Sequence, residues 1–228
     1  MQPAQTTGAA TCNFCGGSTF GPGPGGRLSS TRRPPRCMQC GSLERHRILR
    51  GVYAAIPDAS LAAARCLQFS PDIAAPRERF RSFEVSVFGG DNSLDITRID
   101  RPDASYDWVI ANHVIEHVKD DRAALAEMAR IAGPTGIVQV TVPTPATALT
   151  TIEFAEALPE RSGHWRAYGS DWPASLTPAA RLHTLQATGI DGPTGAWDFV
   201  YCLSRDRQRL LGLGSDLIAS GVPATFWG

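Results

Sequence analysis

The residues with the clearest chemistry are four cysteines near the N-terminus, which form two Cys-x-x-Cys pairs. They are Cys12, Cys15, Cys37 and Cys40. Disulfides do not persist in a reducing compartment, so paired thiolates at this spacing are typical of metal ligands. Two pairs can surround one ion about 2.3 Å from each sulfur and complete a tetrahedron. The sequence therefore predicts a structural zinc ribbon, whereas redox-active pairs would need a thioredoxin-like strand–helix context.

Arginine is the second feature of this region. Residues 27–50 contain seven Arg and one Glu, whereas the later segment 91–121 is rich in Asp and Glu. The overall balance of 22 basic and 22 acidic residues is thus an average over two unlike parts. It excludes a protein held to nucleic acid mainly by net charge. We expect a basic lid over an acidic binding edge, with solvated loop charges or an RNA contact as the alternatives for the arginines.

Length and composition fit one substantial domain with a small appendage. The chain has 228 residues, of which 43% are hydrophobic, so it can bury a core. No stretch approaches the roughly 18–20 apolar residues of a membrane span. The N-terminal residues are polar and lack a signal pattern. We expect a soluble, cytoplasmic protein that does not bind a membrane, and the sequence makes no prediction of its oligomeric state.

The elements that must position the chemistry alternate between strand and helix from residue 65 onward. Apolar or alternating runs predict strands at residues 65–69, 83–88, 107–112, 136–142 and 197–203. Helical spacing and caps predict helices at residues 43–55, 73–80, 120–132, 178–188 and in the tail 206–228. This order implies a doubly wound α/β sheet. Ligands of such sheets bind at the carboxyl ends of the strands, which here carry Ser70, Asp72, Asp91, Asp95, Asn112 and His113.

Several segments in order carry a family resemblance. They are LQFSPD at 67–72, DIT at 95–97, SYDWVIANHVIEHV at 105–118, GPTG at 133–136 and GHWRAYGSD at 163–171. Together they resemble a class I S-adenosylmethionine-dependent methyltransferase. The segment CMQCGSLERHR at 37–47 is similar to the zinc-ribbon lead-in of one subgroup of that family. The resemblance spans roughly residues 12–190, and the block 105–118 is its most specific part.

The resemblance implies an α/β, Rossmann-like doubly wound sheet of the class I methyltransferase type with a small N-terminal zinc ribbon. We expect a zinc-ribbon-like segment at 1–45 and a Rossmann-like S-adenosylmethionine-binding methyltransferase domain at 46–205. That domain carries an insertion at 144–172, and a C-terminal tail covers 206–228. The chain departs from the family at the first motif, where the usual glycine-rich turn is replaced by Phe69-Ser70-Pro71-Asp72.

The resemblance also implies which residues hold the cofactor, S-adenosyl-L-methionine. Asp91 would accept hydrogen bonds from the ribose, and Asp95 with Ile96 would hold the adenine. Asn112 and His113 would face the methyl donor or the acceptor. The predicted cofactor-binding residues are Phe69, Ser70, Asp72, Asp91, Asp95, Ile96, Asn112 and His113. The alternative for Asp91 and Asp95 is that they are ordinary turn carboxylates.

Methyl transfer is an in-line displacement, so the chain must align a nucleophile with the methyl group and exclude water. Histidine titrates near neutrality and is the natural general base. The predicted catalytic residues are His113, His164 and Tyr168, and the predicted substrate-binding residues are His117, His164, Arg166 and Tyr168. The alternative for each histidine is a packing role. HVIEH at 113–117 also matches a metallopeptidase pattern, but its first histidine directly follows a strand rather than lying on a helix.

These features predict an S-adenosylmethionine-dependent methyltransferase with a structural Zn²⁺ and a small-molecule acceptor. One alternative keeps the cofactor and changes the acceptor to RNA, which the arginine cluster would bind. A second keeps the cofactor but uses non-methyl chemistry, alkyl transfer or cyclisation that releases methylthioadenosine. A third is a non-enzymatic interaction module.

Overall fold

A seven-stranded sheet forms the centre of the molecule in the computed structural model, which describes residues 10–143 and 145–227. Its strands, in the order β11-β9-β10-β6-β5-β3-β4 across the sheet, are Ala224–Trp227, His183–Ile190, Trp197–Ser204, Ile137–Thr141, Trp108–Asn112, Arg65–Phe69 and Ser82–Ser86. β4, β3, β5 and β6 are parallel. β10 lies antiparallel between β6 and β9, and β11 is antiparallel to β9. The sheet is therefore mixed, with a parallel half that matches the predicted strand–helix alternation.

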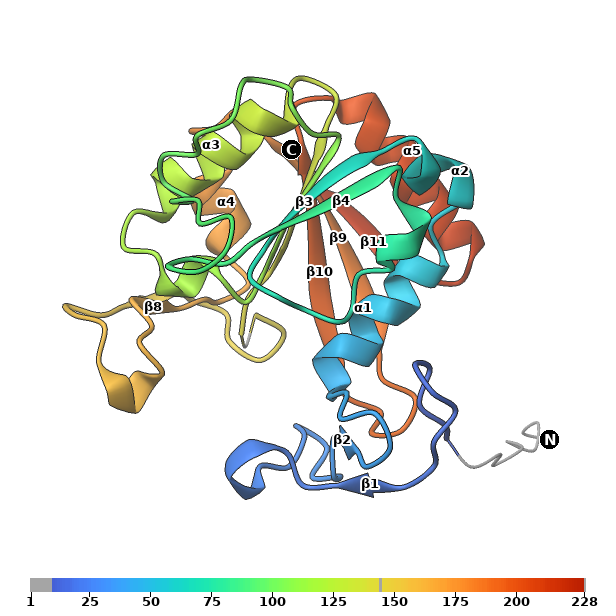
Figure 1. Ribbon diagram of the computed structural model, residues 1–228. Helices are drawn as coiled ribbons and strands as arrows, with labels where there is room; N and C mark the ends of the chain where they lie inside the picture. Colours follow the sequence, from blue (N-terminus) through green and yellow to red (C-terminus); the bar gives the residue numbers. More distant parts are fainter. Residues whose placement is uncertain (1–9, 144, 228) are drawn as a thin grey trace.

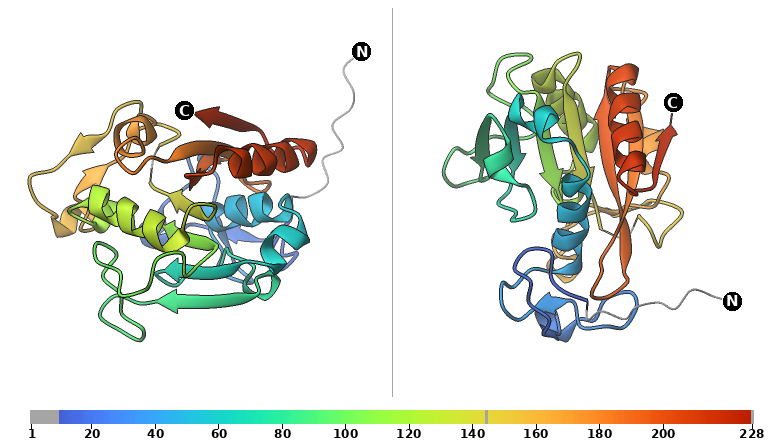
Figure 2. Two further views of the ribbon diagram at one scale, coloured as in Figure 1. Left: turned by 90° about the horizontal axis from the view of Figure 1, so that it is seen from above. Right: turned by 90° about the vertical axis from the view of Figure 1, so that its right-hand side faces the viewer.

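Helices cover both faces of the sheet, as the doubly wound prediction requires (Figure 1 and Figure 2). α3 (Asp121–Ala132) and α4 (Trp172–Leu176) lie on one face, while α1 (Glu44–Ala54), α2 (Asp58–Ala62) and α5 (Arg207–Ala219) lie on the other. Alternate strand residues enter two separate cores, because successive side chains of a strand point to opposite faces. On β3, Leu67 packs in the core beneath α3, and its neighbour Cys66 packs in the core beneath α1 and α5.

The register of the parallel strands brings their carboxyl ends to one edge. Phe69, the last residue of β3, lies opposite Ser86 of β4 and Ala111 of β5. Asn112, the last residue of β5, lies opposite Thr141 of β6. Residues that follow these strands in the sequence are therefore neighbours in space.

The prediction of a helix at 178–188 is wrong, because β9 occupies His183–Ile190. β9 pairs with β10 over eight residue pairs and with β11 over four, so its backbone groups are satisfied from both sides. Such pairing outweighs a local helical pattern. The tail is also only partly helical: α5 ends at Ala219, and Ala224–Trp227 forms the edge strand β11.

The predicted helix at 73–80 shrinks to a single 3₁₀ turn, η2 (Arg77–Arg79). Pro76 precedes this turn. A proline disfavours the helical conformation of the residue before it, so a helix cannot extend back through Ala75. The other predicted strands and helices are confirmed to within two residues at either end, including α1 and α3.

Two additions lie at the carboxyl-end edge of the sheet (Figure 1). The cysteine-bearing segment contains the two-residue strands β1 (Phe20–Gly21) and β2 (Arg36–Cys37), which pair antiparallel, and the turn η1 (Pro24–Gly26). The insertion after β6 contains the paired strands β7 (Ile152–Glu153) and β8 (Arg166–Ala167) and the turn η4 (Pro159–Arg161). Within the described part of the chain, none of the helices has the length and apolarity needed to cross a bilayer.

Candidate active site

A cavity of about 470 Å³ opens at the carboxyl ends of β3, β4 and β5. Its volume falls within the roughly 300–1,000 Å³ range of ligand-binding pockets. Five of the predicted cofactor-binding residues line it, namely Phe69, Ser70, Asp95, Ile96 and His113. The structure therefore brings these residues together from three separate stretches of the sequence, in what we call the strand-end cavity.

The chain turns sharply where it enters this cavity, and it does so without glycine. Ser70 has φ +63° and His113 has φ +52°, in the left-handed region that favours glycine. The Ser70 amide donates to the Ser86 carbonyl and the His113 amide to the Thr141 carbonyl, both at 2.9 Å. Ser70 thus adopts the backbone conformation that a glycine would favour at the first turn. Left-handed non-glycine residues cluster at functional sites, where the surrounding structure holds them in place.

Asp95 lies in the cavity wall with a fixed orientation. Its Oδ1 accepts from the Thr97 amide at 2.8 Å and from the Thr97 hydroxyl at 2.7 Å. These two hydrogen bonds lower the pKa of Asp95. The side chain is therefore held as a carboxylate that presents its second oxygen, which suits an acceptor for a ligand donor.

Three predicted cofactor-binding residues do not line the strand-end cavity. Asp72 uses Oδ1 to accept from the Ala74 amide at 2.6 Å. Asp91 is exposed in the loop after β4. Asn112 is 4% exposed, and its Oδ1 accepts from Gln139 at 3.2 Å on the neighbouring strand. The Asp72 hydrogen bond lies in the turn that follows β3. The Asn112 hydrogen bond instead joins β5 to β6.

Sequence reasoning missed the apolar part of the cavity lining. Those residues are Val87, Phe88, Leu94, Val114 and Val118. Phe88 lies two residues beyond the end of β4 and is 81% exposed. These residues were not predicted because apolar side chains at strand ends are far more often part of the core than of a binding site. The available signal was the alternating strand pattern of 83–88, which continues beyond the end of β4 and carries an aromatic residue to the cavity.

A second, larger cavity of about 720 Å³ adjoins the first. It is enclosed by the cysteine-bearing segment, the start of α1, the chain after β5, the insertion and the turn between β9 and β10. We call it the inter-segment cavity. His113 and His117 line both cavities. The predicted residue His164 reaches the inter-segment cavity from the insertion.

Arg166 and Tyr168, the other predicted substrate-binding residues, line neither cavity. Arg166 is 5% exposed and donates to the carbonyls of Val118 at 2.6 Å and Lys119 at 2.8 Å. The Tyr168 hydroxyl donates to Asp121 at 2.7 Å, and burial raises the pKa of Tyr168. Their side chains join the insertion to the chain after β5, so the structure places them as supports of the cavity wall.

Asp198 is a polar residue of the site that sequence reasoning also missed. It is the second residue of β10, and it lines the inter-segment cavity. Burial raises the pKa of Asp198 to about 6, against the opposing effect of a hydrogen bond from the Phe199 amide. A carboxyl group that titrates near neutrality inside a cavity suits proton transfer.

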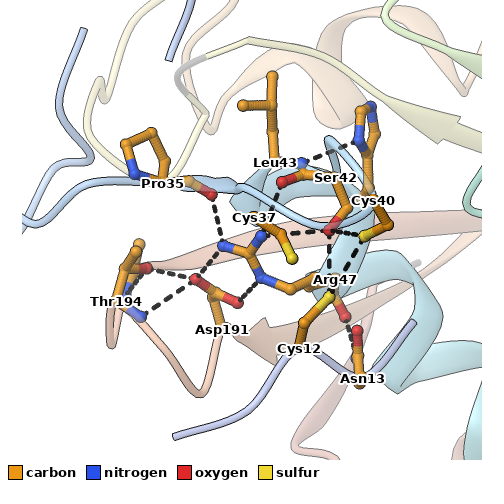
Figure 3. Close-up of polar contacts among 12 residues, drawn as sticks. Cys12, Asn13, Pro35, Cys37, Cys40, Ser42, Leu43, Arg47, Asp191 and Thr194 are labelled. Carbon is orange, nitrogen blue, oxygen red and sulfur yellow. Dashed lines mark hydrogen bonds and ion pairs between the residues drawn. The ribbon is translucent and has the colours of Figure 1, made fainter. Parts of the chain in front are cut away.

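Arg47 is the centre of the contacts that hold the cysteine-bearing segment on the sheet (Figure 3). Its side chain is 1% exposed and forms a two-point ion pair with Asp191 at 2.7 and 2.9 Å. The same guanidinium donates to the carbonyls of Ser42 and Pro35, both at 2.8 Å. It therefore ties the second cysteine pair, the loop before it and the β9–β10 turn together, and it is not available to a ligand.

The basic lid expected over the site is reduced to a few residues. Arg27 and Arg45 line the inter-segment cavity, but Arg27 forms an ion pair with Glu44. His46 lies 3.9 Å from Asp72. Burial lowers the pKa of His46 to about 4, so its ring is neutral at pH 7 and this contact is not an ion pair.

The four predicted metal-ligating cysteines come together. All four Sγ atoms lie within 4.8 Å of one another, and the pairs Cys12–Cys40 and Cys15–Cys37 are each 3.6 Å apart. Four sulfurs placed about 2.3 Å from one ion at tetrahedral corners are about 3.8 Å apart. None of the four is in a disulfide. The cluster therefore has the composition and size of a four-thiolate zinc site.

Comparison with known proteins identifies a methyltransferase domain over residues 64–140. Among solved structures, the chain is similar to an S-adenosylmethionine-dependent methyltransferase of Thermotoga maritima (16% identity, 71% of this chain and 91% of that chain, TM-score 0.45). It is also similar to the 1,6-didemethyltoxoflavin-N1-methyltransferase of Burkholderia thailandensis with bound S-adenosylhomocysteine (13%, 67% and 77%, 0.43). A third is a Haloferax volcanii methyltransferase in complex with the activator Trm112 (12%, 71% and 91%, 0.47).

No curated protein matches this chain. The matched domain, residues 64–140, runs from β3 to β6. It therefore includes the ends of β3 and β5 that border the strand-end cavity.

Proposed function

Residues 64–140 belong to the class I S-adenosylmethionine-dependent methyltransferases, and from this premise we propose that the protein methylates a small molecule held in its inter-segment cavity. S-Adenosylmethionine supplies an electrophilic methyl group when it is bound. The observation that carries the proposal is the shared wall of the two cavities. Because His113 and His117 line both, a donor in one and an acceptor in the other would meet beside them.

The strand-end cavity fits the cofactor by the chemistry of its wall. Phe69, Phe88 and Ile96 offer an apolar surface for a flat base, and Asp95 offers a carboxylate oxygen for an amino group. The tight left-handed turn at Ser70 brings backbone close to the cavity without a bulky residue. These residues would bind and orient the donor, whereas Asp72, Asp91 and Asn112 remain predictions without a place in the lining.

His113 is our proposal for the group that accepts the proton of the acceptor. It stands at the junction of the two cavities, and its backbone is fixed by the hydrogen bond to Thr141. The protein would contribute chiefly by holding donor and acceptor in line and by excluding water, which can supply much of the rate enhancement of a displacement. Asp198 lines the inter-segment cavity, where it would hold the polar side of the acceptor in place.

Two features favour a small molecule over RNA as the acceptor: the shape of the cavity, and the ion pairs that two of the arginines form within the chain. The inter-segment cavity is concave and falls within the range of small-molecule pockets. Arg47 forms an ion pair with Asp191, and Arg27 forms one with Glu44. The arginine cluster therefore presents fewer free charges than the sequence suggested.

Calorimetric titration with S-adenosylmethionine tests the cofactor part of the proposal. We expect binding in the unaltered protein and an affinity loss of about tenfold in Phe88→Ala, because the variant removes an apolar wall. Ile218→Ala is the matched control, since Ile218 is also exposed (59%) but lies on α5. Absence of binding to the unaltered protein would overturn the proposal.

Product analysis tests the chemistry. Incubation with S-adenosylmethionine and a panel of small acceptors should yield S-adenosylhomocysteine, detected by mass spectrometry. His113→Asn should lose turnover and keep cofactor binding, because an amide cannot take up the proton. Methylthioadenosine as the product would show instead the non-methyl chemistry.

We also propose that Cys12, Cys15, Cys37 and Cys40 bind a structural Zn²⁺. The separations between their sulfurs and the absence of disulfides among them support this assignment. Four protein ligands leave no open position, so the ion would stabilise the segment and take no part in the reaction.

A further inference from the structure

A second group of metal-ligating side chains lies in the wall of the inter-segment cavity. It consists of Glu116, His117 and His164, whose ligand atoms all lie within 4.8 Å of one another. Glu116 and His117 belong to the 3₁₀ turn η3 (Ile115–His117) after β5, and His164 belongs to the insertion. The group therefore forms only when the two segments are packed together.

Glu116 carries the signal that this group has a ligand. Its side chain is 1% exposed, and within the described part of the chain neither carboxylate oxygen has a hydrogen-bond partner. The nearest cationic candidate is Nδ1 of His113, 3.7 Å from Oε1 and beyond hydrogen-bond distance. A buried carboxylate without partners is costly, so native proteins satisfy it with a cation or with donors. Glu116 lines the cavity, so such a partner could reach it from there.

The two segments are locked together before any ligand binds. Arg166 is buried in the insertion and donates to the carbonyls of Val118 and Lys119, just past η3. The Trp165 amide donates to the carbonyl of Glu116 itself at 2.8 Å. The neighbours of His164 in the sequence therefore fix it against Glu116 and His117, which is the support that a preorganised site needs.

We propose that Glu116, His117 and His164 bind a divalent transition-metal ion in the wall of the inter-segment cavity. Two imidazoles and one carboxylate form the protein ligand set of open zinc and non-haem iron sites. Ligands of one ion at about 2.1 Å lie some 3–3.5 Å apart, so the side chains would have to move slightly inward on binding. His117 is exposed, and its ring already contacts that of His164 edge to face, with 4.6 Å between the ring centroids.

This site differs from a metallopeptidase centre. The HxxEH pattern at 113–117 would require both of its histidines on one helix. Here His113 has a left-handed backbone directly after β5, and the group that forms uses His117 with a histidine from the insertion. Because Glu116, His117 and His164 all line the inter-segment cavity, the open positions of an ion bound by them would be reached from that cavity. If the proposed function holds, they select an acceptor with an oxygen or nitrogen donor close to the atom that receives the methyl group.

Cobalt titration of the full chain tests the metal site without any need for activity. Protein is stripped with a chelator under reducing conditions and titrated with Co²⁺. We expect two cobalt ions per chain, one with intense thiolate-to-metal charge-transfer absorption and one with only weak visible bands. Glu116→Gln and His164→Ala should each lose the second ion and retain the thiolate absorption. That retained absorption shows that the cysteine cluster is intact in the variants, and an unchanged far-ultraviolet circular dichroism spectrum would show that the sheet and helices are folded.

His183→Ala is the matched control, because His183 lies on β9 and stacks on Phe226 far along the sheet; it should bind two ions. A protein that takes up cobalt only at the thiolate site, or variants that retain the second ion, would overturn the inference. Calorimetry with S-adenosylmethionine on the same samples separates this outcome from the proposed function, since the strand-end cavity does not include Glu116 or His164.

Discussion

At the scale of single residues, Asp198 shows how burial changes the chemistry of an ordinary side chain. Its carboxyl group lies inside the inter-segment cavity, where burial raises the pKa of Asp198 to about 6. Two neighbours act on it more weakly: the positive charge of a protonated His113 would favour the carboxylate, and the Glu44 carboxylate opposes it. Between about pH 4 and pH 6, Asp198 is therefore protonated in the folded chain and ionised in the unfolded chain.

This linkage makes a prediction about stability. A raised carboxyl pKa means that stability falls as pH rises from 4 to 6, and the cost is fully present above pH 6. Asp198→Asn removes the charge and keeps an oxygen for the Phe199 amide. We expect the variant to be more stable than the unaltered protein at pH 7 by on the order of 2 kcal/mol, with the difference largely gone at pH 4.

Urea unfolding at the two pH values measures the difference. Asp100→Asn, a change at an exposed aspartate in a loop, is the control and should shift stability equally at both pH values. An Asp198→Asn variant that is less stable at pH 7 than at pH 4, relative to the unaltered protein, would contradict the assigned cause.

At the scale of elements, Gly189 explains how α1 can pack so closely on β9. A Cβ atom at this position would lie 2.5 Å from Cγ2 of Ile48 and 3.3 Å from the Ile48 carbonyl oxygen. A Cβ atom essentially never comes this close to another carbon, so the branched side chain of Ile48, or α1 with it, would have to shift. The start of α1 lines the inter-segment cavity, and this packing therefore sets the position of part of the cavity wall.

Gly189→Ala should destabilise the fold by about 1–3 kcal/mol, the usual cost of overpacking. Gly192→Ala is the matched control, because a Cβ there meets no atom within 4 Å and its backbone is not left-handed. Thermal or urea unfolding of the two variants gives the comparison. Equal stabilities would show that α1 moves without cost and that its position is not fixed by this contact.

At the scale of the whole molecule, one buried ion pair joins the cysteine-bearing segment to the sheet. Arg47 and Asp191 are 144 residues apart in the sequence, and both side chains are fully buried. Taking one partner away from a buried pair commonly costs about 3–5 kcal/mol. The pair is enclosed by the loop that carries Pro35 and by Ser42, which also contacts the sulfurs of Cys12 and Cys40 at 3.2 Å. The fold of the cysteine cluster and the burial of the ion pair therefore depend on each other.

Removal of the proposed Zn²⁺ should consequently destabilise the contacts of the cysteine-bearing segment with the sheet as well as the segment itself. We expect chelation to lower the melting temperature by roughly 5–10 °C, because a loosened segment admits water to the ion pair. Added Zn²⁺ should restore it and Mg²⁺ should not, since thiolates are soft ligands. The Glu116→Gln variant should show the same shift, which separates the ribbon from the cavity site. An unchanged melting temperature would contradict the structural role of the ion.

The sequence by itself determined the pieces with strong local signals. The two cysteine pairs predict a metal-ligand set and the apolar run at 65–69 predicts a strand, because spacing and apolar runs act over a few residues. The block at 105–118 carries the most specific part of the family resemblance. The residues at the strand ends could be named as site candidates for the same reason. Phe69, Ser70, Asp95, Ile96 and His113 do line one cavity.

Only the tertiary structure decided which polar residues are free to act. Arg166, Tyr168 and Arg47 look like binding residues in the sequence, yet partners from distant segments occupy them. Glu116 appeared in the sequence only as part of the HVIEH pattern, and within the described part of the chain the fold leaves its buried carboxylate without a hydrogen-bond partner. Whether residues 183–190 form helix or strand was likewise settled by strand pairing on both sides. Local patterns specify elements and ligand types, whereas long-range packing determines which of those groups have partners and which face a cavity.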